Sequence, residues 1–190
     1  MSLLEKFEQL IDQDWRLKRE GGEWVVSEPG SEHAFLWISG RRSFAFSLDH
    51  KMKDPFPFMR PNTQLHGMRS TCDAIVIAVK GDETMVVAIE MKTKESDKAK
   101  ALKQIESGRR LVEWLSGLFY LHGHGNLSYR FCGIISLKPR RQERKGTTSR
   151  RTSPLLPPAE TSRNGDPVYV LKNHPRLNLA VLANAMGVGA

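Results

Sequence analysis

The sequence predicts a single α/β domain over residues 1–190, with a central mixed β-sheet flanked by helices. Two apolar runs, 72–79 and 85–91, are separated by a polar, glycine-containing segment at 80–84, which is typical of a β-hairpin. An amphipathic stretch at 98–120 predicts a long helix, and the apolar run 129–137 predicts another strand. A helix between two strands favours a parallel crossover, so the sheet should be mixed.

The composition favours an anionic partner and argues against secretion. Lys and Arg number 29 against 21 Asp and Glu, which gives a net charge of +8, as expected for binding nucleic acid. Cys72 and Cys132 both lie in apolar runs, as reduced buried thiols of a cytoplasmic protein do. Uninterrupted apolar segments reach only about six residues, so we expect neither a membrane span nor a signal peptide.

The N-terminal quarter predicts one helix followed by short strands. Residues 2–15 carry a helical apolar stripe, with Ser2 as N-cap and Glu5 three residues later. Strands follow at 24–26, 34–38 and 43–48, and the last alternates polar and apolar residues as a half-buried strand does. The irregular segment 49–69 is a candidate wall of a substrate cleft, where Phe56 and Phe58 either stack on bases or pack on the core.

Three charged residues interrupt the otherwise apolar hairpin. Asp73 stands at its start, and Glu90 and Lys92 stand at its end. Depending on the length of the loop, Asp73 falls opposite Met91, Glu90 or Lys92, so every register gathers the three charges. Neighbouring carboxylates suit a hard cation such as Mg²⁺, and an adjacent lysine can position a water molecule. The alternative is a strand-entry aspartate beside a solvated Glu90–Lys92 pair on a sheet edge.

Asp73, followed by Glu90-Met91-Lys92 at the end of the next strand, resembles the D…(D/E)xK signature of the PD-(D/E)XK nuclease superfamily. The resemblance covers residues 70–138, and Cys72 stands where that signature usually has proline. It implies a restriction-endonuclease-like α-β-β-β-α-β core. It also implies that Asp73, Glu90 and the Met91 carbonyl hold Mg²⁺, or alternatively Mn²⁺, and that Lys92 is catalytic.

The same resemblance implies two supporting residues. The helix before the core strands often adds an acidic metal ligand, for which Glu8 is the candidate and Asp14 the rival, whereas Glu8 as a plain surface residue is the alternative. The helix after the signature often carries a glutamine that supports the site, here Gln104. Position 108 is Gly, so the tyrosine that one large subgroup has there is missing.

Basic residues near the predicted site are candidates for binding nucleic acid. Lys94 and Lys98 precede or begin the long helix, and they either steer a polyanion or form an ordinary solvated face. Arg140 and Arg141 belong to a basic, Ser/Thr/Pro-rich segment at 138–166 that predicts a flexible loop. This loop either grips nucleic acid or serves as a solubilising insert.

The sequence thus leads to one main functional hypothesis and one alternative. The main hypothesis is a Mg²⁺-dependent endonuclease or exonuclease, for which the resemblance favours DNA over RNA. The alternative is a catalytically inactive, nuclease-fold subunit that binds nucleic acid or serves in assembly. The last elements, a strand at 167–171 and a helix at 177–186, either cap the sheet or dock on a second copy or a partner subunit.

Overall fold

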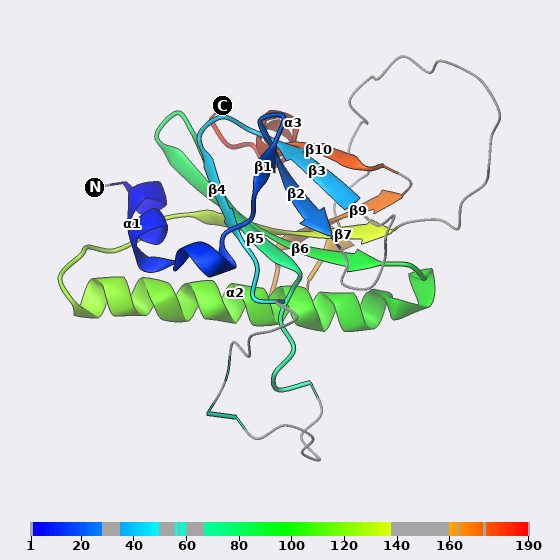
Figure 1. Ribbon diagram of the computed structural model, residues 1–190, viewed down its shortest axis with the longest axis horizontal. Coiled ribbons are helices and arrows are strands. Elements are labelled where there is room, and N and C mark those ends of the chain that lie inside the picture. The colour runs from blue at the N-terminus through cyan, green and yellow to red at the C-terminus, as the bar shows by residue number, and fades with distance from the viewer. Residues whose placement is uncertain are drawn as a thin grey trace.

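Two β-sheets packed face to face, with the long helix α2 along the outer face of the larger sheet, form the fold (Figure 1). The computed structural model describes residues 2–27, 35–49, 56, 58–59, 67–137, 160–162, 164–172 and 174–189. Arg140 and Arg141 lie outside the described residues, as does most of the predicted loop 138–166.

The order of elements along the chain agrees with the predicted α/β class. The helices and 3₁₀ turns are α1 (Leu3–Leu10), η1 (Gln13–Trp15), η2 (Glu95–Asp97), α2 (Lys98–Leu121) and α3 (Leu179–Ala185). The larger sheet contains, in spatial order, β4 (Ser43–Phe46), β5 (Ala74–Lys80), β6 (Glu83–Lys92), β7 (Arg130–Leu137), β9 (Pro167–Lys172) and β8 (Glu160–Thr161). The smaller sheet contains β1 (Arg19–Glu20), β2 (Glu23–Ser27), β3 (Phe35–Ser39) and β10 (Arg176–Asn178). The expected order α-β-β-β-α-β is present as α1-β4-β5-β6-α2-β7 once β1, β2 and β3 of the smaller sheet, which lie between α1 and β4 in the chain, are set aside.

The larger sheet is mixed, as predicted. Strands β4, β5 and β6 pair antiparallel, whereas β6, β7 and β9 pair parallel, and α2 makes the crossover from β6 to β7. Only one face of this sheet is covered by α1 and α2. The other face packs against the smaller sheet and α3, so the predicted flanking helices are present together with a second sheet that was not predicted. The physical reason is that β5, β6 and β7 are apolar on both faces, and both must be shielded from water.

Two predicted elements end differently in the structure. Ser2 and Glu5 form the predicted capping box, but α1 stops at Leu10 because Ile11 adopts an extended backbone and Asp12 caps the separate turn η1. The expected half-buried strand at 43–48 is a fully buried β4, because it lies between α1 on one side and the smaller sheet on the other. The helix predicted at 98–120 is confirmed as α2.

The C-terminal part closes the two-sheet arrangement. Strand β10 pairs parallel with β3, which joins the end of the chain to its N-terminal quarter. The described end of the predicted flexible loop is not irregular, since Glu160–Thr161 form β8 beside β9. Among the described residues, no helix has the length and apolarity needed to cross a membrane.

Candidate functional site

The register of the central hairpin places Asp73 opposite Glu90. Ala74 pairs with Ile89 and Lys80 pairs with Glu83, so a two-residue turn, Gly81-Asp82, connects β5 and β6. Gly81 has a positive φ of 60°, which a glycine adopts without strain. Of the three registers consistent with the sequence, the chain therefore adopts the one that sets the two carboxylates directly across from each other.

Asp73, Glu90 and Lys92, the Asp73 cluster, are joined by reciprocal contacts. The Asp73 N–H donates to Glu90 Oε2 at 3.2 Å, and the Met91 N–H donates to Asp73 Oδ2 at 2.5 Å. The Lys92 ammonium forms an ion pair with Glu90 Oε1. Because side chains two apart share a face, all three point to the α2 side of the sheet, together with Ile75.

Burial separates this cluster from a surface ion pair. Glu90 is 0% exposed and Asp73 8%, while the side chain of Lys92 is 13% exposed. Strand β6 lies between β5 and β7 and is not an edge strand. The alternative of a solvated pair on a sheet edge is therefore wrong. Two acids and one base are held where charge is costly unless it is compensated.

The electrostatics favour a further positive charge at this position. Burial, and next the negative charge of Asp73, raise the pKa of Glu90 to about 7, although Lys92 opposes this shift. Burial also raises the pKa of the Cys72 thiol to about 12, with Glu90 and Asp73 adding to the effect. Cys72 is thus a neutral packing residue and not a nucleophile at neutral pH.

The donor atoms fit a hard divalent cation. In an antiparallel ladder a residue's N–H and C=O point to the same neighbour, so the Met91 carbonyl projects toward β5, on the side where its N–H meets Asp73. Two carboxylates and a carbonyl are oxygen ligands. Mg²⁺ is commonly held by one or two carboxylates, with water and substrate phosphate completing its shell. The residues present therefore fit a Mg²⁺ or Mn²⁺ site.

A third acidic ligand does not join the cluster. Glu8 is exposed on α1, where its backbone carbonyl accepts a hydrogen bond from Arg16, and Asp14 is exposed on η1. In the part of the chain that the structure describes, no group of three or more His, Cys, Asp or Glu side chains is arranged to hold a metal. The prediction of Glu8 as a ligand thus finds no support in the geometry.

Gln104 lies on α2 beside the segment that leads into Asp73. Its side-chain Nε2 donates to the Thr71 carbonyl at 3.1 Å. Its Oε1 is buried and has no hydrogen-bond partner among the described residues. Gln104 therefore fixes the backbone two residues before Asp73 and presents one unsatisfied acceptor. The contact with Thr71 was not predicted, because no sequence pattern marks a backbone carbonyl as a partner.

The glycine at position 108 has a packing reason. A Cβ added to Gly108 would lie 2.5 Å from the sulfur of Cys72 and 3.5 Å from the Cβ of Ala88. Helix α2 thus approaches the sheet so closely that a tyrosine at this position has no room. Gly108 and Cys72, which stands where the resembled signature has proline, are in contact with each other.

The predicted basic residues lie along the connection from β6 to α2. Lys94 is exposed just before η2, and Lys98 is the half-buried first residue of α2. Both are close in sequence to Lys92, at the end of β6. Lys172, which the sequence did not single out, reaches from the end of β9 to Glu95 at 2.6 Å. Cationic side chains that follow β6 and end β9, the two parallel strands on either side of β7, thus lie at the same end of the sheet.

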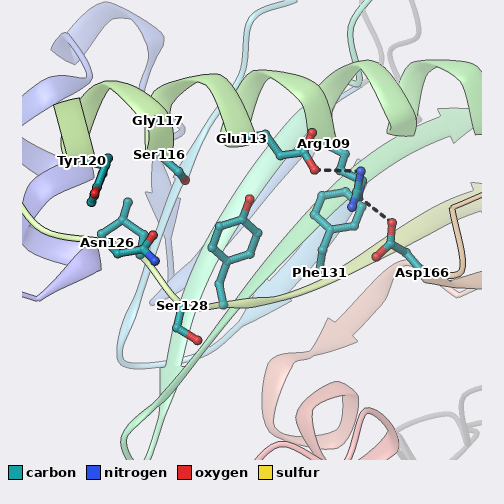
Figure 2. Close-up of a pocket in the computed structure, with 11 residues that line it drawn as sticks. Arg109, Glu113, Ser116, Gly117, Tyr120, Asn126, Ser128, Phe131 and Asp166 are labelled. Carbon is teal, nitrogen blue, oxygen red and sulfur yellow. Dashed lines mark ion pairs between the residues drawn. The ribbon is translucent and has the colours of Figure 1, made fainter.

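Two hollows lie beside α2, and neither is lined by Asp73, Glu90 or Lys92. The first, of about 750 Å³, contains Arg109, Glu113 and Asp166, the Arg109 cluster (Figure 2). Figure 2 shows Arg109 between the two acids. Its guanidinium lies 2.8 Å from the Glu113 carboxylate and 2.6 Å from that of Asp166. The second, of about 760 Å³, lies between α1, α2 and described residues of the segment before β5.

No protein-family model, curated protein or solved structure matches this chain.

Proposed function

We propose that this protein is a metal-dependent nuclease that hydrolyses phosphodiester bonds. The observation that carries the proposal is the pairing of Asp73 with Glu90 at the ends of adjacent strands, buried and accompanied by Lys92. This arrangement offers hard oxygen ligands and a cationic group at one point. DNA as substrate rests on the resemblance to PD-(D/E)XK nucleases, and a cytoplasmic location stays a prediction.

Each residue of the cluster has a distinct role in this proposal. Asp73, Glu90 and the Met91 carbonyl would hold Mg²⁺, which when bound supplies charge neutralisation at the phosphate and a more acidic water. Lys92 is held in place by Glu90 and is the most exposed of the three charges. Its ammonium can therefore donate hydrogen bonds to a substrate phosphate or to the attacking water. Gln104 acts as a positioning residue through Thr71.

The direct test is cleavage of end-labelled DNA and RNA by the purified protein with Mg²⁺ or Mn²⁺. Cleavage should require the metal, and Asp73→Ala and Lys92→Ala should each lower the rate by roughly 100-fold or more. Asp166→Asn, which alters the Arg109 cluster, is the matched control and should retain activity. Cleavage that persists with a chelator, or in both cluster variants, would overturn the proposal.

One observation favours a second candidate, an inactive nuclease-fold subunit that binds nucleic acid or serves in assembly. Both Glu90 oxygens already have partners, Lys92 and the Asp73 N–H, so the carboxylate is satisfied within the protein. In that case nucleic acid should bind equally well with Mg²⁺ and with a chelator, and no cleavage should occur. Metal-dependent cleavage that is lost in Asp73→Ala would exclude this candidate.

A further inference from the structure

The second hollow beside α2 is an aromatic groove that leads toward the candidate site. Its walls include Trp15 of η1, Phe58 from the segment before β5, and Trp114 of α2. Phe58 is 80% exposed and Trp114 60%, so large aromatic surface is open to solvent. Thr71, which accepts the hydrogen bond from Gln104, lines the same groove two residues before Asp73. The groove is therefore adjacent to the approach to the Asp73 cluster.

The face of α2 that borders this groove is basic toward the start of the helix. Lys103, Ser107, Arg110 and Trp114 are spaced three and four residues apart and so share one helical face. Lys100 lies beside them on this face. Lys100 and Lys103 are exposed and have no ion-pair partner within the described ranges. Positive charge thus extends from the end of the helix near β6 to the aromatic groove.

The charges that line the groove itself are few. Arg110 pairs with Glu106 and with Glu113, each at 3.0 Å, and its side chain is still 62% exposed. Of these two acids only Glu106 lines the groove, and Asp12 is the second acid on its wall. An apolar aromatic surface with basic side chains at one end is complementary to a ligand with flat apolar faces and an anionic backbone. It is not complementary to a purely ionic ligand.

We propose that the aromatic groove binds unpaired bases of single-stranded DNA, with the strand's phosphates along Lys100 and Lys103. Bases in a duplex are stacked on one another, whereas those of a single strand can stack on aromatic side chains. This inference rests on the proposed nuclease function, since it names the substrate class of the same site. The binding step itself requires neither a metal nor Asp73.

The test measures, by fluorescence anisotropy, how tightly a labelled oligo(dT) of about fifteen nucleotides binds to the full chain in the presence of a chelator. Trp114→Ala should weaken binding by about fivefold to 150-fold, the range for removing one aromatic stacking partner. Tyr120→Ala is the matched control, since Tyr120 is 69% exposed on the same helix but borders the other hollow. It should leave the affinity unchanged. Lys103→Gln should reduce the dependence of binding on salt.

Three results would overturn the inference: equal affinity for a blunt linear duplex, equal losses in Trp114→Ala and Tyr120→Ala, or no loss in Trp114→Ala. A wild-type dimer that becomes a monomer in Trp114→Ala, with DNA binding unchanged, would also overturn it in favour of a contact between copies. The two proposals fail separately. Single-stranded DNA binding that depends on Trp114, without any cleavage, would support the groove proposal and contradict the nuclease proposal. Metal-dependent cleavage, with DNA binding unchanged in Trp114→Ala, would support the nuclease proposal and contradict the groove proposal.

Discussion

The Asp73 cluster and the Arg109 cluster each combine two acids with one base, and they differ in what holds the charges. In the Arg109 cluster the base lies between the acids, and the three side chains are 19–34% exposed. In the Asp73 cluster the acids face each other across two strands, and the base contacts Glu90 from one side. The first is an ordinary ion-pair network. The second leaves two buried carboxylates adjacent, which is the arrangement that a cation would relieve.

This difference shows that the identity of the residues does not define a site. Both clusters have two acids and one base, and the Arg109 cluster lines a hollow (Figure 2) whereas the Asp73 cluster lines neither of the two hollows beside α2. What distinguishes the Asp73 cluster is the backbone, because strand pairing brings together acids that side-chain freedom alone would keep apart. In the Arg109 cluster the acids come from a helix surface and a turn and are free to turn toward their base.

The largest expected difference between the clusters concerns removal of the base. Lys92→Met leaves Glu90 buried without its cation and should lower the free energy of unfolding at pH 8 by about 3 kcal/mol. Arg109→Met leaves two partly solvated acids, of which Glu113 keeps Arg110 as a partner, and should cost about 1 kcal/mol. Urea denaturation of the two variants measures both values. Equal losses would contradict the distinction drawn between the clusters.

The pH dependence of stability should reveal the raised pKa of Glu90. Its ordinary value of 4.5 applies to the unfolded chain, whereas the folded value is about 7, so the folded protein holds the extra proton between these values. The stability that Glu90 contributes should therefore be lost as the pH rises from about 4.5 to about 7, by up to about 3 kcal/mol.

The test is the substitution Glu90→Gln, which removes this titration. Denaturation of the variant and the wild type at pH 5 and pH 7.5 measures the free energy of unfolding of each. The stability of the variant should lack the part of the pH dependence that comes from Glu90. Relative to the wild type, the variant should therefore be more stable at pH 7.5 than at pH 5. Burial also raises the pKa of Asp166, but Arg109 opposes that shift. Asp166→Asn should therefore change the pH profile less. The same dependence of stability on pH in Glu90→Gln and in the wild type would contradict a raised pKa of Glu90.

A smaller effect is expected from the close approach of α2 to the Asp73 segment. Gly108→Ala places a Cβ against the sulfur of Cys72 and should destabilise the protein by about 1–3 kcal/mol. Gly117→Ala, in the same helix with nothing within 4 Å of the new Cβ, is the control and should stabilise by up to about 1 kcal/mol. Thermal unfolding of both variants measures the contrast. A stabilised Gly108→Ala protein would show that the helix does not pack this closely.

Local patterns in the sequence were enough to predict the hairpin and α2, because a period-2 and a period-3.6 apolar pattern are strong signals. The gathering of Asp73, Glu90 and Lys92 followed from the same pattern, since each of the three plausible loop lengths brings them near one another. Which residue faces Asp73 did not follow, because the register depends on the two-residue turn at Gly81.

Long-range pairing was beyond the sequence. Nothing local indicates that β10 lies beside β3, and so the second sheet over the larger one was not predicted. The end of α1 at Leu10 was missed because the apolar stripe continues through Ile11, whose extended backbone is followed by the turn that Asp12 caps. The aromatic groove was only partly visible in the sequence. Phe56 and Phe58 were noted there, whereas Trp15 and Trp114 join them only through packing.

Titration calorimetry with Mn²⁺ and Mg²⁺ on the purified chain tests the central claim most directly. The Asp73 cluster predicts one divalent cation per chain, with binding lost in Asp73→Asn and Glu90→Gln and retained in Asp166→Asn of the Arg109 cluster. Absence of binding to the wild-type chain, or binding that survives both substitutions in the Asp73 cluster, would contradict a metal site at this pair of carboxylates.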